Sequence, residues 1–320
     1  MSFGWPRCGS GPPPCYCRGS PLPRSSMPAS LSAVPRVALA LVFVATNTVL
    51  HCIPLFVLAL VKLVLPVAVV RRGLSRMLAG IGESWIRINS FMMSRFAGTR
   101  IVVEGVEGLR HEGWYLVLCN HQSWVDIPVL QSVFNRRIPL LRFFLKSQLI
   151  WVPMLGLAWW ALDFPFMKRY SREVVERRPE LRGKDVEATR KACAKYRKLP
   201  VSVMNFVEGT RFTPAKHARQ QSPFTHLLKP RAGGIALVLD AMGDMLEAIV
   251  DVSIVYPQGR PTVLDLMAGR VHEVRVHVRT LPIPAELLGG DYETDADYRE
   301  RFQTWLNALW NAKDARIERI

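Results

Sequence analysis

A histidine and an aspartate five residues apart are the clearest chemical feature of this sequence. His121 and Asp126 lie in the stretch Asn-His-Gln-Ser-Trp-Val-Asp, which begins at Asn120 and follows an apolar segment at 114–119. An imidazole accepts a proton near neutral pH, and a carboxylate can hold its other nitrogen and stabilise the cation that forms. The spacing therefore predicts a general base with its orienting acid, suited to a substrate that brings its own hydroxyl group.

Three further blocks place polar or charged residues where apolar segments end. The segment 164–167 ends in two cations, 206–207 ends in a Glu-Gly-Thr-Arg run, and 251–255 ends in Tyr-Pro. Ligands in open α/β sheets bind beyond the carboxyl ends of strands, so we expect these blocks to meet His121 there. The side chains at the first two of these ends are Lys168, Arg169, Glu208, Gly209, Thr210 and Arg211.

The elements that must position these residues follow an α/β pattern from residue 100 onward. The predicted strands are 100–103, 115–119, 164–167, 202–207, 250–255 and 274–279. The predicted helices are 126–134, 184–197, 233–241 and 296–316. This alternation predicts an α/β fold with a mixed, mainly parallel sheet flanked by helices, preceded by an N-terminal membrane helix or helical hairpin.

Charge and cysteine usage narrow the class of protein. The 320 residues carry a net charge of +16, and eight lysines or arginines precede Glu83, the first acidic residue. A basic chain with a long apolar segment indicates an anionic membrane surface rather than nucleic acid. The six cysteines have no metal-ligand spacing, which indicates a reducing compartment without a disulfide framework or a metal site.

The chain divides into three predicted parts. Residues 1–26 are rich in Gly, Pro, Ser and Arg and are predicted to be a disordered tail, or a product of a start site upstream of the true one at Met27. Residues 27–76 are the predicted membrane-anchoring segment, and residues 77–320 are the predicted catalytic domain.

The apolar run at 37–70 has a length that allows two arrangements. As a straight helix it would reach ~50 Å, against a hydrocarbon core of ~30 Å. A single tilted span and a hairpin that enters one leaflet and returns both remain open. Arg71, Arg72 and Arg76 follow the run and favour the cytoplasmic side for the rest of the chain.

The order of the four blocks resembles the glycerolipid acyltransferase family, whose members acylate lysophosphatidate and other lysophospholipids. The likeness is strongest at the family's N-H-x4-D block, which begins here at Asn120, and at its F-x-E-G-T-R block, matched at 206–211. Arg169 matches the arginine of the second block. The segment 252–257, Val-Ser-Ile-Val-Tyr-Pro, departs from the usual V-P-V pattern and is more similar to the lysophospholipid and lysocardiolipin branch. The likeness covers about residues 102–278, and the whole chain is similar to bacterial inner-membrane members.

The resemblance, together with the chemistry of the residues, implies a role for each. His121 would deprotonate the sn-2 hydroxyl of a lysophospholipid, which attacks the thioester of the acyl donor, while Asp126 orients the histidine. Arg211, with Arg169 and its neighbour Lys168, would bind the acceptor phosphate. The residues that would support them are Asn120 within its motif, Gly209 and Thr210 beside the phosphate, and Glu208, which would brace an arginine or the histidine or bond an acceptor hydroxyl.

The resemblance also implies the partners and the compartment. The donor would be acyl-CoA or acyl carrier protein, the acceptor 1-acyl-sn-glycerol-3-phosphate or another lysophospholipid, and no cofactor or metal would take part. The third partner would be the lipid bilayer, with the catalytic domain on the cytoplasmic face of the inner membrane, and no nucleic acid is expected. Two other classes stay open: a thioesterase acting on acyl-thioesters, and a non-enzymatic basic membrane-binding protein.

A chain that begins at Met27 is expected to insert into the membrane and to turn over substrate as the full chain does.

Deleting residues through Val70 is expected to reduce activity on vesicle-embedded acceptor more than on micellar acceptor, because an anchored site meets its substrate in two dimensions. Assays of the full and truncated chains with both forms of acceptor measure this ratio. An unchanged ratio would mean that the apolar run has another purpose, such as oligomerisation.

Overall fold

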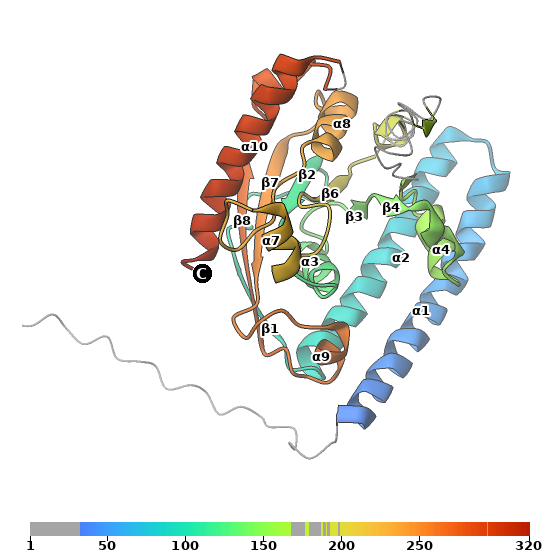
Figure 1. Ribbon diagram of the computed structural model, residues 1–320. Coiled ribbons are helices and arrows are strands. Elements are labelled where there is room, and N and C mark those ends of the chain that lie inside the picture. The colour runs from blue at the N-terminus through green and yellow to red at the C-terminus, as the bar shows by residue number, and fades with distance from the viewer. Residues whose placement is uncertain are drawn as a thin grey trace, which may run out of the picture. The chain divides into compact units, whose positions relative to one another are not determined.

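Two long helices form a hairpin at the start of the described chain (Figure 1). The computed structural model describes residues 33–167, 177–178, 187, 190, 193–197, 199–292 and 294–320. α1 spans Ala33–Val64 and α2 spans Ala68–Arg95. Pro66 lies between them, where a residue without an N–H cannot donate the bond that a continuing helix needs. Among the described helices, α1 is the one long and apolar enough to cross a membrane, and α2 runs back along it.

Three polar residues within the apolar run of α1, Asn47, Thr48 and His51, make hydrogen bonds to α2. Asn47 is buried, and its amide donates to Asn89 Oδ1 at 2.9 Å and to the Trp85 carbonyl at 3.2 Å. The Trp85 indole in turn donates to Thr48 Oγ1 at 3.1 Å. Such groups would be costly to expose to hydrocarbon without partners. They are satisfied between the two helices and therefore fix the antiparallel register of the hairpin.

A small apolar cluster joins the hairpin to the rest of the molecule. It consists of Cys52, Leu55, Leu78, Ala158 and Ala161. The last two belong to α4 (Leu155–Ala161). α2 continues across residues 76 and 77, where the sequence predicted a domain boundary, and buries Ile86 in the core beneath the sheet. Deleting the chain through Val70 would therefore remove packing as well as an apolar segment.

A six-stranded sheet lies at the centre of the remaining structure. Its strand order is β1-β8-β7-β2-β6-β3, in which β7, β2, β6 and β3 are parallel, β8 is antiparallel to β7, and β1 is parallel to β8. The strands are β1 (Arg100–Glu104), β2 (Tyr115–Cys119), β3 (Leu141–Phe143), β6 (Ser202–Phe206), β7 (Ala248–Val255) and β8 (Glu273–Leu281). The predicted α/β fold with a mixed, mainly parallel sheet is confirmed.

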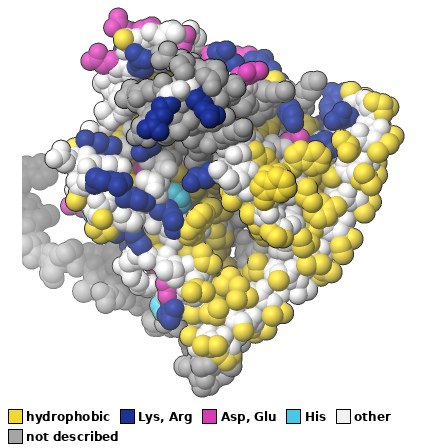
Figure 2. Space-filling view, turned by 45° about the vertical axis from the view of Figure 1, so that its right-hand side comes forward, with side chains coloured by type: hydrophobic (Ala, Val, Ile, Leu, Met, Phe, Trp, Pro, Cys, Tyr) yellow, Lys and Arg dark blue, Asp and Glu magenta, His cyan; other side chains and the backbone are white. Residues whose placement is uncertain are grey.

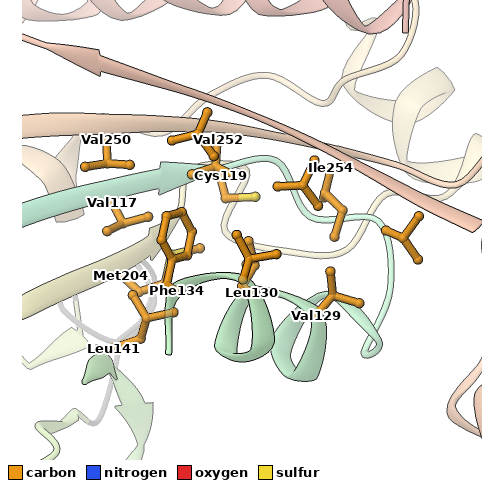
Figure 3. Packing of buried hydrophobic residues seen from close by; sticks show 14 of the residues in the cluster. Val117, Cys119, Val129, Leu130, Phe134, Leu141, Met204, Val250, Val252 and Ile254 are labelled. Atoms are coloured by element: carbon orange, nitrogen blue, oxygen red, sulfur yellow. The ribbon is translucent and has the colours of Figure 1, made fainter. Parts of the chain in front are cut away.

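Helices cover both faces of the sheet, and the strand β2 is therefore buried on both sides. The covering helices are α2, α3 (Asp126–Phe134), α8 (Gly233–Met242) and α10 (Ala296–Ile317). Val117 and Cys119 of β2 pack toward α3, as Figure 3 shows, in a cluster that also includes residues of α2. Leu116 and Leu118 point the other way, into the cluster that includes α8 and α10. A strand with this environment requires the continuous apolar run from which it was predicted.

The second predicted block does not join the main sheet. β5 (Phe166–Met167) pairs instead with β4 (Leu145–Lys146) in a two-stranded sheet. Pro165 has no N–H to donate to a strand ladder, and its carbonyl accepts a bond from Leu145 N at 2.9 Å. The strand predicted at 164–167 is therefore shorter than expected and lies outside the sheet that carries His121.

The tryptophans of the segment 149–162 lie partly in the core and partly at the surface. In the tryptophan-rich segment, η1 (Ser147–Trp151) precedes α4, and Trp159 packs on the core whereas Trp151 and Trp160 are 85% and 50% exposed. The other short helices are α7 (Pro214–Gln220), α9 (Val263–Met267) and η3 (Ala285–Leu287). The predicted tail at 1–26, Lys168, Arg169 and most of the helix predicted at 184–197 lie outside the described residues.

A buried ion pair attaches α10 to the sheet. Asp251 of β7 and Lys313 of α10 are fully buried, with Nζ and Oδ1 2.6 Å apart. Arg279 and Arg316 approach the same carboxyl group at 2.8 and 3.5 Å. Burial acts to raise the pKa of Asp251, but Lys313 and Arg279 outweigh it and hold that pKa below its ordinary value. Lys313 also donates to the Leu118 carbonyl at 3.4 Å, close to the strand end that carries His121.

Replacing Lys313 by Met is expected to lower the free energy of unfolding by about 3 kcal/mol, because the Asp251 charge loses its fully buried partner. The double variant Lys313→Met/Asp251→Asn is expected to recover more than half of that loss. Thermal unfolding of detergent-solubilised protein, followed by near-UV circular dichroism, measures both. Arg270→Met, which breaks an exposed ion pair, is the control and should change little. A double variant no more stable than Lys313→Met would contradict the electrostatic explanation.

Candidate functional site

Three parallel strands bring the predicted site residues to one edge of the sheet. β2, β6 and β7 run in the same direction, and each is followed directly by a loop that carries polar side chains. His121 follows β2, Glu208 follows β6 and Tyr256 follows β7. The carboxyl edge that the sequence predicted as the site therefore holds the first, third and fourth blocks, and the second block ends in residues outside the described chain.

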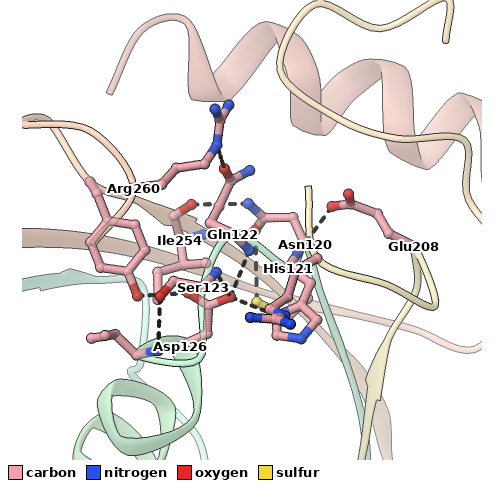
Figure 4. A network of polar contacts seen from close by, with 12 residues as sticks. Asn120, His121, Gln122, Ser123, Asp126, Glu208, Ile254 and Arg260 are labelled. Carbon is pink, nitrogen blue, oxygen red and sulfur yellow. Dashed lines mark hydrogen bonds and ion pairs between the residues drawn. The ribbon is translucent and has the colours of Figure 1, made fainter. Parts of the chain in front are cut away.

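The His121 and Asp126 side chains are in direct contact. His121 Nδ1 and Asp126 Oδ2 are 2.8 Å apart, and because a carboxylate only accepts, Nδ1 carries the hydrogen. The same oxygen accepts from the backbone N–H groups of Gln122 and Ser123 at 2.7 and 3.0 Å (Figure 4). The Tyr256 hydroxyl donates to the other carboxylate oxygen at 2.6 Å. Four donors thus satisfy both oxygens of a fully buried carboxyl group.

The imidazole is held from a second side by an aromatic ring. The ring of Phe206 stacks on that of His121, with centroids 3.9 Å apart and planes inclined by 13°. The His121 side chain is 12% exposed. Within the described residues its Nε2 has no hydrogen-bond partner, whereas Nδ1 is occupied. The arrangement therefore leaves Nε2 as the atom that can accept a proton from a substrate.

Two side chains near the histidine could in principle act as nucleophiles, and both are engaged or buried. The Ser123 hydroxyl donates to the Pro261 carbonyl and accepts from the Val125 N–H at 3.0 Å. Cys119 is fully buried, and this burial raises the pKa of its thiol well above the ordinary value. The site therefore presents a base without an adjacent reactive hydroxyl or thiolate from these residues.

Asn120 continues the pairing between β2 and β7 beyond the end of β2. Its side-chain amide donates to the Ile254 carbonyl at 2.9 Å, and its oxygen accepts from the Ile254 N–H at 2.9 Å. The residue is fully buried. An amide side chain can replace a backbone peptide in this double contact. The sequence predicted Asn120 only as a supporting residue of its motif, and the structure shows that it positions the loop.

Glu208 connects the two loops that form the site. One carboxyl oxygen accepts from the His121 N–H at 3.0 Å (Figure 4). The other accepts from the Leu228 N–H at 3.2 Å. It therefore braces the histidine through the backbone and not through the imidazole. Burial raises the pKa of Glu208 to about 8, and the two N–H donors oppose that rise.

The remaining residues of the Glu-Gly-Thr-Arg run form the exposed rim. Gly209 has a φ of 67°, and a Cβ there would lie 3.1 Å from the Arg231 side chain, so the turn requires glycine. Lys216 donates to Thr210 Oγ1 at 2.7 Å and to the Arg211 carbonyl at 2.9 Å. These contacts fix the loop and leave the arginine side chain at the surface.

Arg211 lies against the loop that carries His121. Its guanidinium carbon is 4.5 Å from the centroid of the Trp124 ring, and Trp124 belongs to the same loop as His121. The face of an indole attracts a guanidinium cation and leaves the edges of the guanidinium free for hydrogen bonds. Lys168 and Arg169, the other predicted phosphate ligands, lie outside the described residues.

Two residues of the site were missing from the sequence prediction. Tyr256 lies in the fourth block, directly after a predicted strand. That position could have indicated that it belongs to the site at the carboxyl edge of the sheet. Arg260 lies four residues further on, and its Nε donates to Gln122 Oε1 at 2.6 Å. No local pattern marked Arg260, because its hydrogen bond with Gln122 joins residues 138 positions apart.

Comparisons with known proteins show which proteins this chain is similar to. A family model described as "Acyltransferase" matches residues 100–257. Lysocardiolipin acyltransferase 1 of Gallus gallus is 25% identical over 254 residues, which are 75% of this chain and 62% of the relative. The 1-acyl-sn-glycerol-3-phosphate acyltransferase gamma of Mus musculus is 29% identical over 182 residues, which are 53% of this chain and 43% of the relative.

A solved structure was also found to be similar. The 1-acyl-sn-glycerophosphate (LPA) acyltransferase PlsC of Thermotoga maritima matches with a TM-score of 0.47 and 16% identity, over 87% of this chain and 98% of that chain. The chain spans only about two fifths to three fifths of the length of these curated relatives.

Glu208 is expected to make stability fall as the pH rises. Its pKa is about 8 in the folded protein, against ~4.3 for an unperturbed glutamate, so the folded chain holds a proton that the unfolded chain releases between these values. The thermal midpoint of the wild type should therefore fall more than that of Glu208→Gln between about pH 5.5 and about pH 8.5. Glu112→Gln, at an exposed glutamate, is the control. Parallel curves for wild type and Glu208→Gln would contradict the raised pKa.

Proposed function

This chain belongs to the acyltransferase family that includes the 1-acyl-sn-glycerol-3-phosphate acyltransferases, and from that premise we propose that it transfers an acyl chain from acyl-CoA or acyl carrier protein to a lysophospholipid. The acceptor we propose is 1-acyl-sn-glycerol-3-phosphate, which is acylated at its sn-2 hydroxyl to give phosphatidate. The observation that carries the proposal is the 2.8 Å contact between His121 Nδ1 and Asp126 Oδ2 at the carboxyl edge of the sheet.

The proposed reaction is direct transfer between the two substrates. The sn-2 hydroxyl gives its proton to His121 Nε2 as its oxygen attacks the thioester carbonyl carbon. The C–S bond then breaks, the new ester forms, and the imidazolium returns the proton to the departing thiolate. Asp126 keeps the histidine in the required tautomer and stabilises the imidazolium. The engagement of Ser123 and the burial of Cys119 support attack by the acceptor itself.

The phosphate of the acceptor is proposed to bind on the basic rim. Arg211 supplies a planar, permanently charged fork, and Arg169 and Lys168 are proposed to add charge from the second block. Thr210 and Gly209 allow the backbone to come close to the phosphate oxygens. A hydrolytic thioesterase would need no such clamp, so the position of Arg211 against the His121 loop favours transfer.

The hairpin is proposed to hold the enzyme on the cytoplasmic face of the inner membrane. Figure 2 shows hydrophobic side chains gathered over the side of the molecule formed by the hairpin. The exposed apolar residues there include Leu39, Ile53, Leu60, Trp151, Leu157 and Trp160. α2 begins with Arg71 and Arg72, which suit the phosphates of an anionic leaflet. These features support a hairpin that lies in one leaflet and presents the site to lipid at that surface.

His121→Ala is expected to reduce kcat for acyl transfer by about 10³-fold or more while the protein stays folded, because it removes the proposed base. Asp126→Asn is expected to cost a similar or smaller factor, through the wrong tautomer. The measurement is transfer of labelled acyl chains from acyl-CoA and from acyl carrier protein to lysophosphatidate and to neutral-headgroup lysolipids.

His272→Ala provides a matched control, because the His272 side chain is exposed and belongs to neither of the loops that carry His121 and Glu208. Its kcat should equal that of the wild type. A His121→Ala variant that keeps a large fraction of turnover would show that the proposed mechanism is wrong. Release of free fatty acid at the same rate with and without acceptor would identify a thioesterase instead.

A further inference from the structure

Arg260 is fixed against both loops of the proposed catalytic site. It lies in the loop after β7, and its Nε donates to Gln122 Oε1 at 2.6 Å (Figure 4). Its guanidinium carbon lies 3.8 Å from the centroid of the Phe212 ring. Gln122 is the neighbour of His121, and Phe212 is the neighbour of Arg211. One cation therefore contacts residues adjacent to the proposed base and to the proposed phosphate-binding arginine.

The two loops that hold Arg260 are themselves tied together. The Phe212 N–H donates to the His121 carbonyl at 2.8 Å, and Glu208 accepts from the His121 N–H. An arginine held by two connected loops loses little further conformational freedom when it binds a ligand, because its aliphatic stem and its Nε are already ordered. The position is therefore more like a prepared binding group than a freely moving surface side chain.

The charge of Arg260 lacks a carboxylate partner within the part of the chain that the structure describes. Some other exposed arginines do have such a partner, among them Arg270 with Asp265 at 2.7 Å and Arg110 with Glu247 at 2.7 Å. Although Arg260 reaches the surface, nearby protein withholds water from its guanidinium and lowers its pKa, an effect that Glu208 partly offsets. A partly desolvated cation without a counter-ion is unfavourable until an anion arrives.

We propose that Arg260 binds a phosphate group of one of the two substrates and so helps to determine which phosphate-bearing substrate the enzyme accepts. The Nε contact with Gln122 leaves the two terminal nitrogens for two phosphate oxygens, a geometry that lysine cannot reproduce. The phosphate is either the monoester of the acceptor or a phosphate of the donor, since both carry the same anionic oxygens. The inference rests on the proposed acyl transfer and assigns a further residue to it.

The test uses full-length Arg260→Ala and Arg260→Lys in detergent micelles, with Arg270→Ala as the matched exposed arginine. KM and kcat are measured for lysophosphatidate, for a monoacylglycerol that has no phosphate, for acyl-CoA and for acyl carrier protein. Arg260→Ala is expected to raise the KM of one phosphate-bearing substrate by about tenfold or more, with kcat within about twofold. Arg260→Lys should keep part of the affinity, because it keeps the charge and loses the fork. Arg270→Ala should leave every KM unchanged.

The identity of the affected substrate distinguishes the two sources of phosphate. A rise confined to lysophosphatidate, with monoacylglycerol unaffected, assigns Arg260 to the acceptor, and a rise in the donor KM assigns it to the donor. Unchanged KM values, or an equal loss toward lysophosphatidate and monoacylglycerol without a change in donor KM, would overturn the proposal. If Arg260→Ala does not fold, the same comparison is made with Arg260→Lys. Wild-type transfer and its loss in His121→Ala test the proposed function separately.

Discussion

The fully buried Asp126 carboxylate is the group on which the site depends. A charge removed from water must be satisfied by donors, and here the donors come from three different sources: the His121 ring, the backbone at Gln122 and Ser123, and the Tyr256 hydroxyl. The requirement to satisfy one carboxylate therefore fixes the histidine tautomer, the turn that leads into α3, and the distance between the loops after β2 and β7. Because the donors are shared in this way, a change at any of them alters the position of the base.

The same physical principle is repeated around this centre. Asn120 replaces a missing backbone pair between two strands, and Glu208 accepts from two backbone N–H groups that belong to different loops. Buried polar side chains thus complete hydrogen bonds that the strands leave open when they end. Arg211 and Arg260, in contrast, rest on aromatic rings at the surface. The buried centre is consequently held by hydrogen bonds, while the rim carries positive charge that suits the proposed phosphate-bearing acceptor.

The hairpin is part of this architecture and not an appendage to it. Asn47 and its partners fix the register of α1 on α2, and α2 then runs into the core beneath the sheet, where Ile86 is buried. The exposed apolar surface of the hairpin and the polar site at the carboxyl edge of the sheet are in this way carried by one compact unit from Ala33 to Ile320. That continuity would let an α/β sheet of this kind carry out the proposed reaction on an acceptor held in lipid.

The sequence by itself determined the features that depend on local spacing. The His121–Asp126 pair, the Glu-Gly-Thr-Arg run, the buried strand Tyr115–Cys119 and the helix Asp126–Phe134 were predicted because each is encoded within a few residues. Only the tertiary structure decided which groups meet across long separations. It placed Tyr256 on Asp126, Arg260 on Gln122 and the Glu208 carboxyl on the His121 backbone, and it moved β5 into a second sheet. Contacts of this kind depend on strand order and on where each loop leaves the sheet, and neither is written in local periodicity.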